Sequence, residues 1–487
     1  MLTLADFEAR LVASLQDTEI IARYNAGDPL VVQQARANAA YLALLAQEID
    51  VATIEPFIKA RDRSILADAT NKGILPTATP CQHRLEVINS GSVSISLSQG
   101  RVIEDSQGGR PWRLLASITV NPASTAEVLV EQSELREVSY AIPITESFHR
   151  VPVAITDGLS LASLTVRDDE SIPNVYRLAP RWMNAAPAEY AVTVGTDSLQ
   201  RIIVEFGDDA RVGRTAQLNQ VFTFVLTECY GAVDTARLKD ATLAELLSRE
   251  ERLVRVRFKS AGLVRAGADP LSIAQLRLLA SYPALYDENA VFLGNFDFLA
   301  RKNFMARSDY LAVWNEVVQE RTYAVVSLDD INRLHLAVMA KNSDEQVLIE
   351  TEISQLLGRA DSLYEGRIKV HAVVARPYQL IITGRLAAVH DIDAVAAQIR
   401  GLLTSKYGRG TVAASRWMPD GMNSQEVATL LRSTISAFQD RISDFGVSGE
   451  SLSDQPVKPH EWLYLTDTSI TIALSRTADT GGTLWTL

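Results

Sequence analysis

The spacing of hydrophobic and polar positions changes along the chain, and each spacing predicts a different kind of element. Over residues 4–71 apolar residues recur every three or four positions, which predicts amphipathic helices, the longest from Pro29 to about Ile54. Over residues 84–231 apolar and polar residues alternate in short runs between turn residues, which predicts antiparallel strands in sandwich-like sheets. Beyond residue 331 the two spacings follow one another in the order β-α-β-β-α-β, which is typical of a ferredoxin-like region. The sequence therefore predicts an α+β multi-domain protein with N-terminal helices, an antiparallel β-sandwich-like middle and a C-terminal ferredoxin-like (βαββαβ) α+β region.

Turn residues and changes of spacing also indicate where one domain ends and the next begins. We expect an N-terminal helical region (1–80), an antiparallel β domain (81–235), a mixed, mainly helical connector (236–328), a ferredoxin-like α+β domain (329–420) and a C-terminal helix–strand extension (421–487). Inside the connector, the spacing predicts helices over 240–253, 295–306 and 308–318. The last strand of the ferredoxin-like domain is predicted over 411–417.

The long predicted helix that starts at Pro29 carries a stripe typical of a coiled-coil seam. Its members are separated by 4, 3, 4, 3 and 4 positions: Val31, Ala35, Asn38, Leu42, Leu45 and Ile49. A single Asn in such a stripe can fix the register in which two helices pair. The stripe covers fewer than three heptads, and a helix lying on its own domain would show the same pattern. The sequence leaves both interpretations open, a seam for a partner chain and a face buried within the protein.

The stretch from Arg201 to Gly231 reads as two strands around a turn. Apolar residues alternate with others up to Phe206, and the alternation restarts at Val221. Between them, Gly207 tolerates positive φ, and the Asp208 and Asp209 carboxylates can bond local backbone N–H groups. A long hairpin inside a β domain is one interpretation. A second takes Asp208 and Asp209 as a metal-binding pair, but phosphoryl transfer also needs further carboxylates and a basic channel.

The same stretch resembles the signature of a known family. A strand ends in Phe206-Gly207-Asp208, Gly213 follows, and a second strand ends in a T-x-x-x-G phrase at Gly231. Two later phrases keep the family's order, LVRAGADPLSIAQLR with Gly267, Asp269 and Arg277, and RKNFMARSDY with Asp309 and Tyr310. Together these phrases are similar to those of baseplate-J-like proteins, the wedge components of contractile phage tails and related injection machines. The chain departs from the family at Arg265-Ala266, at Pro270-Leu271 where an acid is common, and at Ser308, where the family has Thr.

The resemblance implies a structural role with neither cofactor nor metal. Members of the family pair with a second copy of themselves. They also bind other baseplate wedge proteins, the tail hub and sheath-initiator proteins. They form a ring around the tail hub and relay a change of the baseplate to sheath contraction. The resemblance further implies a location in the virion, at the tail baseplate, after assembly in the cytoplasm of the bacterial host.

Charge and cysteine content restrict the other classes of function. A net charge of −12, from 47 basic and 59 acidic residues, disfavours a general nucleic-acid or anionic-membrane binder. No run approaches the ~18 apolar residues of a membrane-spanning helix, and the N-terminal segment lacks the apolar region of a signal peptide. Cys81 and Cys229 are the only cysteines, too few for a disulfide scaffold or a zinc site, which fits a reducing compartment.

Catalytic motifs are weak, so we expect no enzyme and predict no catalytic, cofactor-binding or metal-ligating residue. The six histidines show no H-x-x-x-H spacing, and the chain lacks a G-x-S-x-G phrase. Asp444-Phe445-Gly446 copies a kinase tripeptide without the H-R-D phrase or the glycine-rich loop that kinases need. An alternative of a different class is a β-rich carbohydrate-binding or carbohydrate-processing protein. It is suggested by aromatic residues among the predicted strands, namely Trp112, Trp182 and Tyr190.

Overall fold

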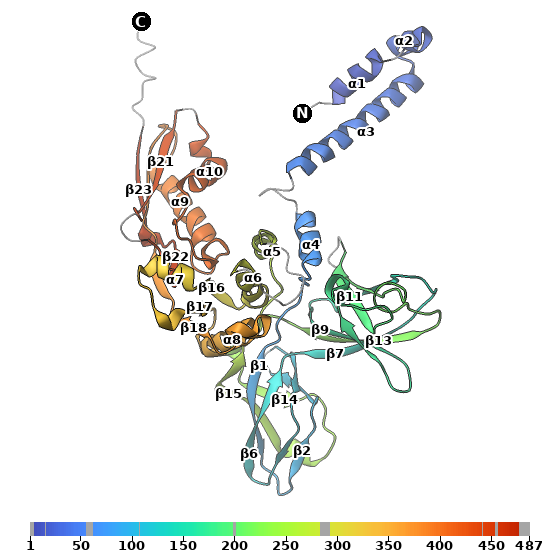
Figure 1. The fold of residues 1–487 in the computed structure, drawn as a ribbon, viewed down its shortest axis with the longest axis vertical. Coiled ribbons are helices and arrows are strands. Elements are labelled where there is room, and N and C mark those ends of the chain that lie inside the picture. Colours follow the sequence, from blue (N-terminus) through green and yellow to red (C-terminus); the bar gives the residue numbers. More distant parts are fainter. Residues whose placement is uncertain are drawn as a thin grey trace. The chain divides into compact units, whose positions relative to one another are not determined.

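The protein is an α+β chain that divides into two compact units, Met1–Asp68 and Ala69–Leu487 (Figure 1). The computed structural model describes residues 4–14, 16–54, 62–106, 108–197, 201–282, 293–440, 442–452 and 456–476. The finer domain bounds given above stay predictions.

The first unit is built on one long helix. Helices α1 (Leu4–Ala13) and α2 (Thr18–Asn25) both pack on α3 (Pro29–Ile54). The Asp28 carboxylate accepts a hydrogen bond from the Leu30 amide at 3.0 Å, and Pro29 occupies the first helical position. The structure confirms the predicted start and length of this helix. Helix α4 (Asp62–Asn71) follows.

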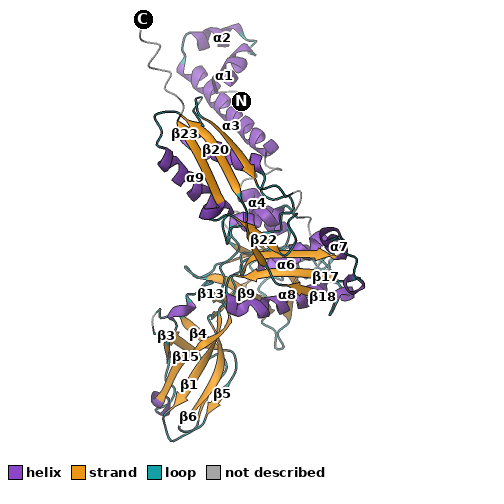
Figure 2. Cartoon of the chain, turned by 90° about the vertical axis from the view of Figure 1, so that its left-hand side faces the viewer, coloured by secondary structure: helices purple, strands orange, loops and turns teal. Residues whose placement is uncertain are grey.

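Six strands of the second unit close into a β-barrel (Figure 2). In barrel order they are β1 (Gln82–Asn89), β15 (Val254–Arg265), β14 (Asp240–Leu243), β3 (Val102–Asp105), β4 (Pro111–Leu114) and β6 (Ser124–Glu131). Strands β2 (Ile95–Leu97) and β5 (Ile118–Val120) pair separately. The core includes Leu85, Val87, Ile103, Trp112, Val130 and Phe258.

The predicted helix over 240–253 is wrong, because its first part is strand β14, which pairs with both β3 and β15. The segment was misread because four residues are too short to show a spacing, and its hydrogen bonds come from two other strands, one of which, β3, is far away in the chain.

The other β element is a seven-stranded sheet. Its order is β7 (Glu134–Ala141), β13 (Val221–Cys229), β9 (Ser160–Asp168), β10 (Val175–Leu178), β11 (Ala191–Thr196), β12 (Ile202–Glu205) and β8 (Arg150–Val153). All neighbours are antiparallel except β10 and β11. The middle of the chain is thus a closed barrel, a seven-stranded sheet and the small β2–β5 pair, and the sandwich-like pair of sheets that the sequence predicted is not what these strands form.

The predicted hairpin over 201–231 is also wrong, although both of its strands exist. Strand β12 pairs with β11 and β8, whereas β13 pairs with β7 and β9. The connection over 206–220 is a long loop with local bonds of its own, so it does not fix the register of a hairpin in the way a two-residue turn does.

A helical segment leads from the barrel to a second, smaller sheet. Helices α5 (Ile273–Ala280) and α6 (Leu293–Phe304) precede strand β16 (Ser308–Asn315) and helix α7 (Glu316–Tyr323). Helix α6 confirms the helix predicted over 295–306. The helix predicted over 308–318 is wrong in its first part, because β16 is buried on both faces. A short run that is apolar on both sides has no period that separates strand from helix.

The C-terminal part does not form the ferredoxin-like sheet. Strand β17 (Leu334–Ala340) lies between β16 and β18 (Ile368–His371), and helix α8 (Gln346–Ala360) connects β17 to β18. Strand β20 (Leu380–Leu386) lies in another sheet, between β21 (Asp444–Gly449) and β23 (Ile470–Arg476). Strands β19 (Val374–Pro377) and β22 (Glu461–Tyr464) pair with each other in a separate two-stranded parallel sheet.

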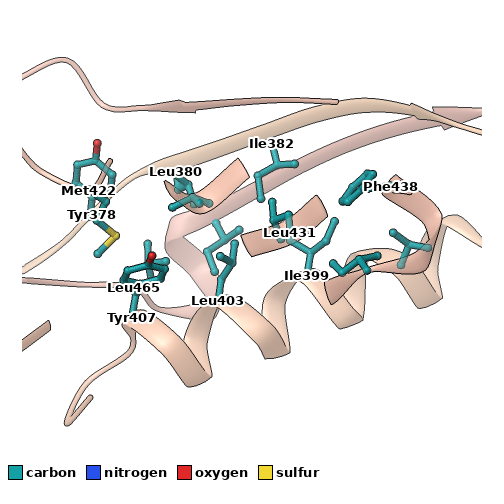
Figure 3. Close-up of a cluster of buried hydrophobic side chains, with 14 of the residues drawn as sticks. Tyr378, Leu380, Ile382, Ile399, Leu403, Tyr407, Met422, Leu431, Phe438 and Leu465 are labelled. Atoms are coloured by element: carbon teal, nitrogen blue, oxygen red, sulfur yellow. The ribbon is translucent and has the colours of Figure 1, made fainter. Parts of the chain in front are cut away.

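The expected last strand over 411–417 contains a short 3₁₀ turn, Ala413–Ser415, instead. Without that strand, β20 takes its neighbours from residues beyond 440. Helices α9 (Ile392–Tyr407) and α10 (Ser424–Thr434) pack on one face of its sheet (Figures 1 and 3). The core that they share includes Leu380, Ile382, Ile399, Leu403, Leu431 and Phe438 (Figure 3).

Candidate interaction surfaces and motif junction

The first unit covers only part of the predicted seam on α3. Ala35 is buried, and Val31 is half-buried. Asn38 is exposed, and Leu42 and Leu45 keep 39% and 47% of their surface. The side chain of Ile49 lies outside the described residues. The N-terminal end of the stripe is therefore a face within the unit, and Leu42 and Leu45 lie beyond it.

The C-terminal half of α3 also exposes apolar residues beside the seam. Tyr41 and Leu44 keep 70% and 62% of their surface, so apolar side chains project on more than one side. A helix that is apolar all round is normally buried on all sides. The exposed part of α3, defined by Tyr41, Leu42, Leu44 and Leu45, is here called the α3 surface.

The half-buried carboxylate of Glu8 joins helices α1, α2 and α3 of the first unit. Glu8 on α1 accepts hydrogen bonds from the Tyr24 hydroxyl at 2.7 Å and from Arg36 Nε at 3.2 Å. The hydrogen bond from Tyr24 holds the pKa of Glu8 below its usual value. Because Tyr24 lies on α2 and Arg36 on α3, this contact fixes the three helices against one another. None of the residues of the α3 surface takes part in it.

The first family phrase forms a tight loop after strand β12. Phe206 is fully buried and contacts the ring of Phe222 at 4.3 Å between centroids. A Cβ on Gly207 would lie 2.2 Å from the Val212 carbonyl oxygen, so only glycine fits at this point. Asp208 accepts from the Ala210 amide at 2.8 Å, and a hydrogen bond from Ser147 lowers the pKa of this carboxyl.

Gly213 lies at the end of the same loop and has a left-handed φ of +68°. A Cβ there would lie 2.4 Å from a ring carbon of Trp182, so the indole covers this glycine. The Gly213 amide donates to the Ala186 carbonyl at 2.9 Å, which ties the loop to residues that follow Trp182.

The last glycine of the first phrase meets the second phrase. Gly231 has a φ of +73° and follows strand β13. A Cβ on Gly267, which follows β15, would lie 1.9 Å from the Gly231 carbonyl oxygen. The Asp269 carboxylate accepts from the Ala232 amide at 2.9 Å. The two backbones thus cross in direct contact, and the family phrases supply the glycines and the acid that this crossing needs.

Two further segments complete this crossing, and a ring of hydrogen bonds joins all four. Thr79 and Ala268 exchange backbone bonds of 2.8 and 3.0 Å. The Gln132 amide donates to the Cys81 carbonyl at 2.8 Å, and the Gln132 side-chain oxygen accepts from the Tyr230 amide at 2.8 Å. These four segments, 79–81, 132, 230–232 and 267–269, are here called the motif junction.

At the motif junction the chain enters and leaves strands of the barrel and of the seven-stranded sheet. Segment 79–81 enters β1, Gln132 lies between β6 and β7, 230–232 follows β13, and 267–269 follows β15. Cys81 is fully buried beside Gly267, and burial raises the pKa of its thiol to about 12. The cysteine therefore acts as a small packed side chain and not as a thiolate nucleophile.

The third phrase holds a buried arginine. Arg301 is 2% exposed; it donates from Nε to Asp297 at 2.8 Å and from Nη1 to the Ser415 carbonyl at 3.2 Å. Its Nη2 also donates to the Leu311 carbonyl. Burial is the largest single influence and lowers the pKa of Arg301, but the Asp297 carboxylate together with Tyr282 and Tyr310 raises that pKa overall. The guanidinium thus fixes α6 to β16 and to the 3₁₀ turn near Ser415.

The other residues singled out in the two later phrases are Tyr310, Asp309 and Arg277, and they differ in burial and in contacts. Tyr310 is fully buried, and its hydroxyl donates to the Pro459 carbonyl at 2.6 Å. Asp309 has a pKa raised by burial, although Arg409 lies 3.8 Å away. Arg277 is half-buried on α5. The sequence pointed to the phrase that contains Arg301 but did not single out this residue, which is the most buried charge in it.

The alternative sites offer little chemistry. Asp209 and Thr215 bond one another's backbone amides, so the Asp208-Asp209 pair shapes the loop. In the part of the chain that the structure describes, no group of three or more His, Cys, Asp or Glu side chains could hold a metal ion. Trp112 is fully buried, and Arg214 lies over the Tyr190 ring at 4.4 Å. With Trp182 over Gly213, these aromatic rings are engaged within the protein.

No helix within the described ranges has the length and apolar character needed to cross a bilayer. No protein-family model matches the chain, and no curated protein matches it. Among solved structures, the chain is similar to a chain of the cryo-EM structure of the anti-feeding prophage (AFP) baseplate, 6-fold symmetrised. The two share 14% sequence identity over 97% of this chain and 90% of that chain, with a TM-score of 0.29. A TM-score of this size does not establish a common fold, so the functional argument rests on the residues of this chain and their geometry.

Proposed function

We propose that this protein is a structural component of the baseplate of a contractile phage tail or a related contractile injection particle, where it acts as a wedge protein. The observation that carries the proposal is the motif junction. Gly231, Gly267 and Asp269 belong to two phrases that resemble the baseplate-J-like signature, and they meet at one crossing. A chance likeness of short phrases would not be expected to select the residues that a backbone crossing requires.

The α3 surface supports an assembly role for the first unit. It presents Tyr41, Leu42, Leu44 and Leu45 to solvent on a helix whose other end is already packed. Contiguous apolar surface of this kind on a soluble protein is typical of a protein–protein contact. In our proposal, helices of other wedge proteins pack against this surface in a bundle.

The sheet formed by β21, β20 and β23 supports pairing with a second copy. Helices α9 and α10 cover one face, and the opposite face is open and, apart from Arg385 and Asp444, carries small or uncharged residues around Ile381, which is 43% exposed. Its other exposed members are Thr383, Arg385, Asp444, Gly446, Ser448, Thr471, Ala473 and Ser475. A weakly charged face of this kind suits a self-complementary two-fold contact. The remaining proposed contacts are with the tail hub and sheath-initiator proteins, in the virion after assembly in the bacterial host cytoplasm. Through these contacts, the protein would relay a change of the baseplate to contraction of the sheath.

Substitution on the α3 surface tests the proposal. The Leu42→Asp, Leu45→Asp variant places two carboxylates where a partner helix would bury apolar side chains, so we expect loss of copurification with the other wedge chains. The matched control is Gln33→Asp, Gln34→Asp, which adds the same charge to exposed positions of the same helix. Assembly that both variants leave unchanged would contradict a role for the α3 surface.

A further inference from the structure

Three of the six histidines in the chain lie in one column of aromatic rings. Trp314 on β16 stacks on His335 of β17, with 5.6 Å between ring centroids. His371 on β18 follows at 5.1 Å from His335, and His460 lies 6.4 Å from His371. Tyr323, the last residue of α7, stacks on His460 at 6.0 Å. The five rings, here called the histidine column, come from four elements and the segment before β22.

The hydrogen bond between two histidines of the column requires that at least one of the two imidazoles is neutral. Nδ1 of His335 lies 2.9 Å from Nε2 of His371, so one ring donates and the other accepts. The Tyr323 hydroxyl lies 2.5 Å from Nδ1 of His460. If both His335 and His371 carried a second proton, both facing nitrogens would be donors, and two positive charges would lie at hydrogen-bond distance.

The charged groups around the column do not offset such a charge. Asp330, in the 3₁₀ turn before β17, lies 3.9 Å from Nε2 of His335, but Lys369 on β18 already pairs with it at 3.1 Å. Glu461 beside His460 pairs with Arg376 of β19 at 2.9 Å. Lys458 lies over the Tyr323 ring at 5.1 Å. Arg333 directly precedes β17, and the neutral Gln319 of α7 accepts a hydrogen bond from the Trp314 indole.

The column lies where the chain leaves the sheet of β16, β17 and β18 and enters the sheet of β19 and β22. His371 ends β18, and β19 begins at Val374, whose amide donates to the His460 carbonyl at 2.9 Å. Strand β22, which pairs with β19, begins directly after His460. The rings thus hold the segment of Lys458–Glu461 against the sheet of β16, β17 and β18.

We propose that the histidine column is an acid-sensitive latch, which protonation opens by breaking the His335–His371 hydrogen bond and releasing the segment before β22. Burial lowers the pKa of His335 to about 4 and also lowers the pKa values of His371 and His460. A histidine whose pKa is lower in the folded state stabilises that state fully above its unfolded value, near 6.5. This stabilisation is lost as the pH falls from there toward the folded pKa.

Hydrogen exchange of the full-length protein tests the latch. We would compare peptides that contain Val374 and residues 458–464 between about pH 7.5 and 5.5, after correction for the intrinsic pH dependence of exchange. One histidine with a strongly lowered pKa makes local opening about tenfold more favourable over this interval. We therefore expect exchange in these peptides to rise about tenfold, and exchange in peptides over strands β9 and β13, which contain no histidine, to stay within about twofold.

Two variants separate the latch from general acid sensitivity. In His371→Gln the side-chain amide can donate to a neutral His335 and can also accept from a protonated one, so a charge on His335 no longer breaks the bond and the acid response should fall to less than about half of the wild-type rise. His390→Gln changes a part-exposed histidine outside the column and should keep the full response. A wild-type protein without the rise, or an equal rise in His371→Gln, would overturn the proposal.

Discussion

The motif junction makes a direct prediction for the substitution Gly267→Ala. The added Cβ would lie 1.9 Å from the Gly231 carbonyl oxygen, a distance that real Cβ contacts do not show. The two backbones would have to separate by about 1 Å, and overpacking of this kind costs about 1–3 kcal/mol. Opening one hydrogen bond of the ring, such as the bond from the Ala232 amide to Asp269, adds about 1 kcal/mol.

We therefore expect the junction to lose about 3 kcal/mol of local stability. A single unfolding midpoint is poorly defined for a chain of several domains, so the assay is local hydrogen exchange. Peptides over 79–82 and 230–233 should exchange about a hundredfold faster than in the wild type, since 1.36 kcal/mol corresponds to a factor of ten.

The matched control is Gly401→Ala on helix α9. A Cβ at that position meets no heavy atom within 4 Å. Alanine in a helix interior stabilises it by up to about 1 kcal/mol relative to glycine. The junction peptides should be unchanged in this control. If Gly267→Ala also left these peptides unchanged, the claim that the two phrases cross in unavoidable contact would be refuted.

Two further substitutions test other parts of the account. Arg301→Lys keeps the charge but cannot span the acceptors on Asp297, Ser415 and Leu311, so we expect a local loss of about 3 kcal/mol, read as faster hydrogen exchange in peptides over 297–304 and 411–417. The exposed Arg400→Lys is its control, and exchange left unchanged by Arg301→Lys would contradict the anchoring role. Ile381→Lys should weaken self-association by at least about tenfold in sedimentation velocity, because an unpaired lysine would be desolvated in the contact. Ile172→Lys, at a position 83% exposed elsewhere, should not, and equal effects would remove the proposed pairing face.

Several elements followed from the sequence because their signals are local. Asp28 and Pro29 carry the start signal of α3 within two residues, and the structure confirms that helix. The strand partners did not follow, since β12 and β13 show the right alternation but pair with other strands. Strand β16 was misread because burial on both faces removes the alternation that distinguishes a strand.

The candidate sites divide in the same way. Gly231 and Gly267 were singled out from phrases, and the structure gives each a conformation or a contact that only glycine accepts. Gln132, whose side chain completes the hydrogen-bond ring, carries no local signal. The histidines of the column are isolated in the sequence, and only the pairing of β16, β17 and β18 brings them together. Pairing partners far apart in the chain cannot be read from a spacing.

The central claim is that this protein is a baseplate component, and copurification tests it most directly. The tagged chain would be produced in cells together with the products of its native neighbouring genes, and the partners identified and counted by mass. The account predicts recovery of tail-tube, sheath or other wedge chains in a fixed ratio, lost in Leu42→Asp, Leu45→Asp and kept in Gln33→Asp, Gln34→Asp. Recovery of the chain by itself, or with an unrelated metabolic enzyme, would contradict the account.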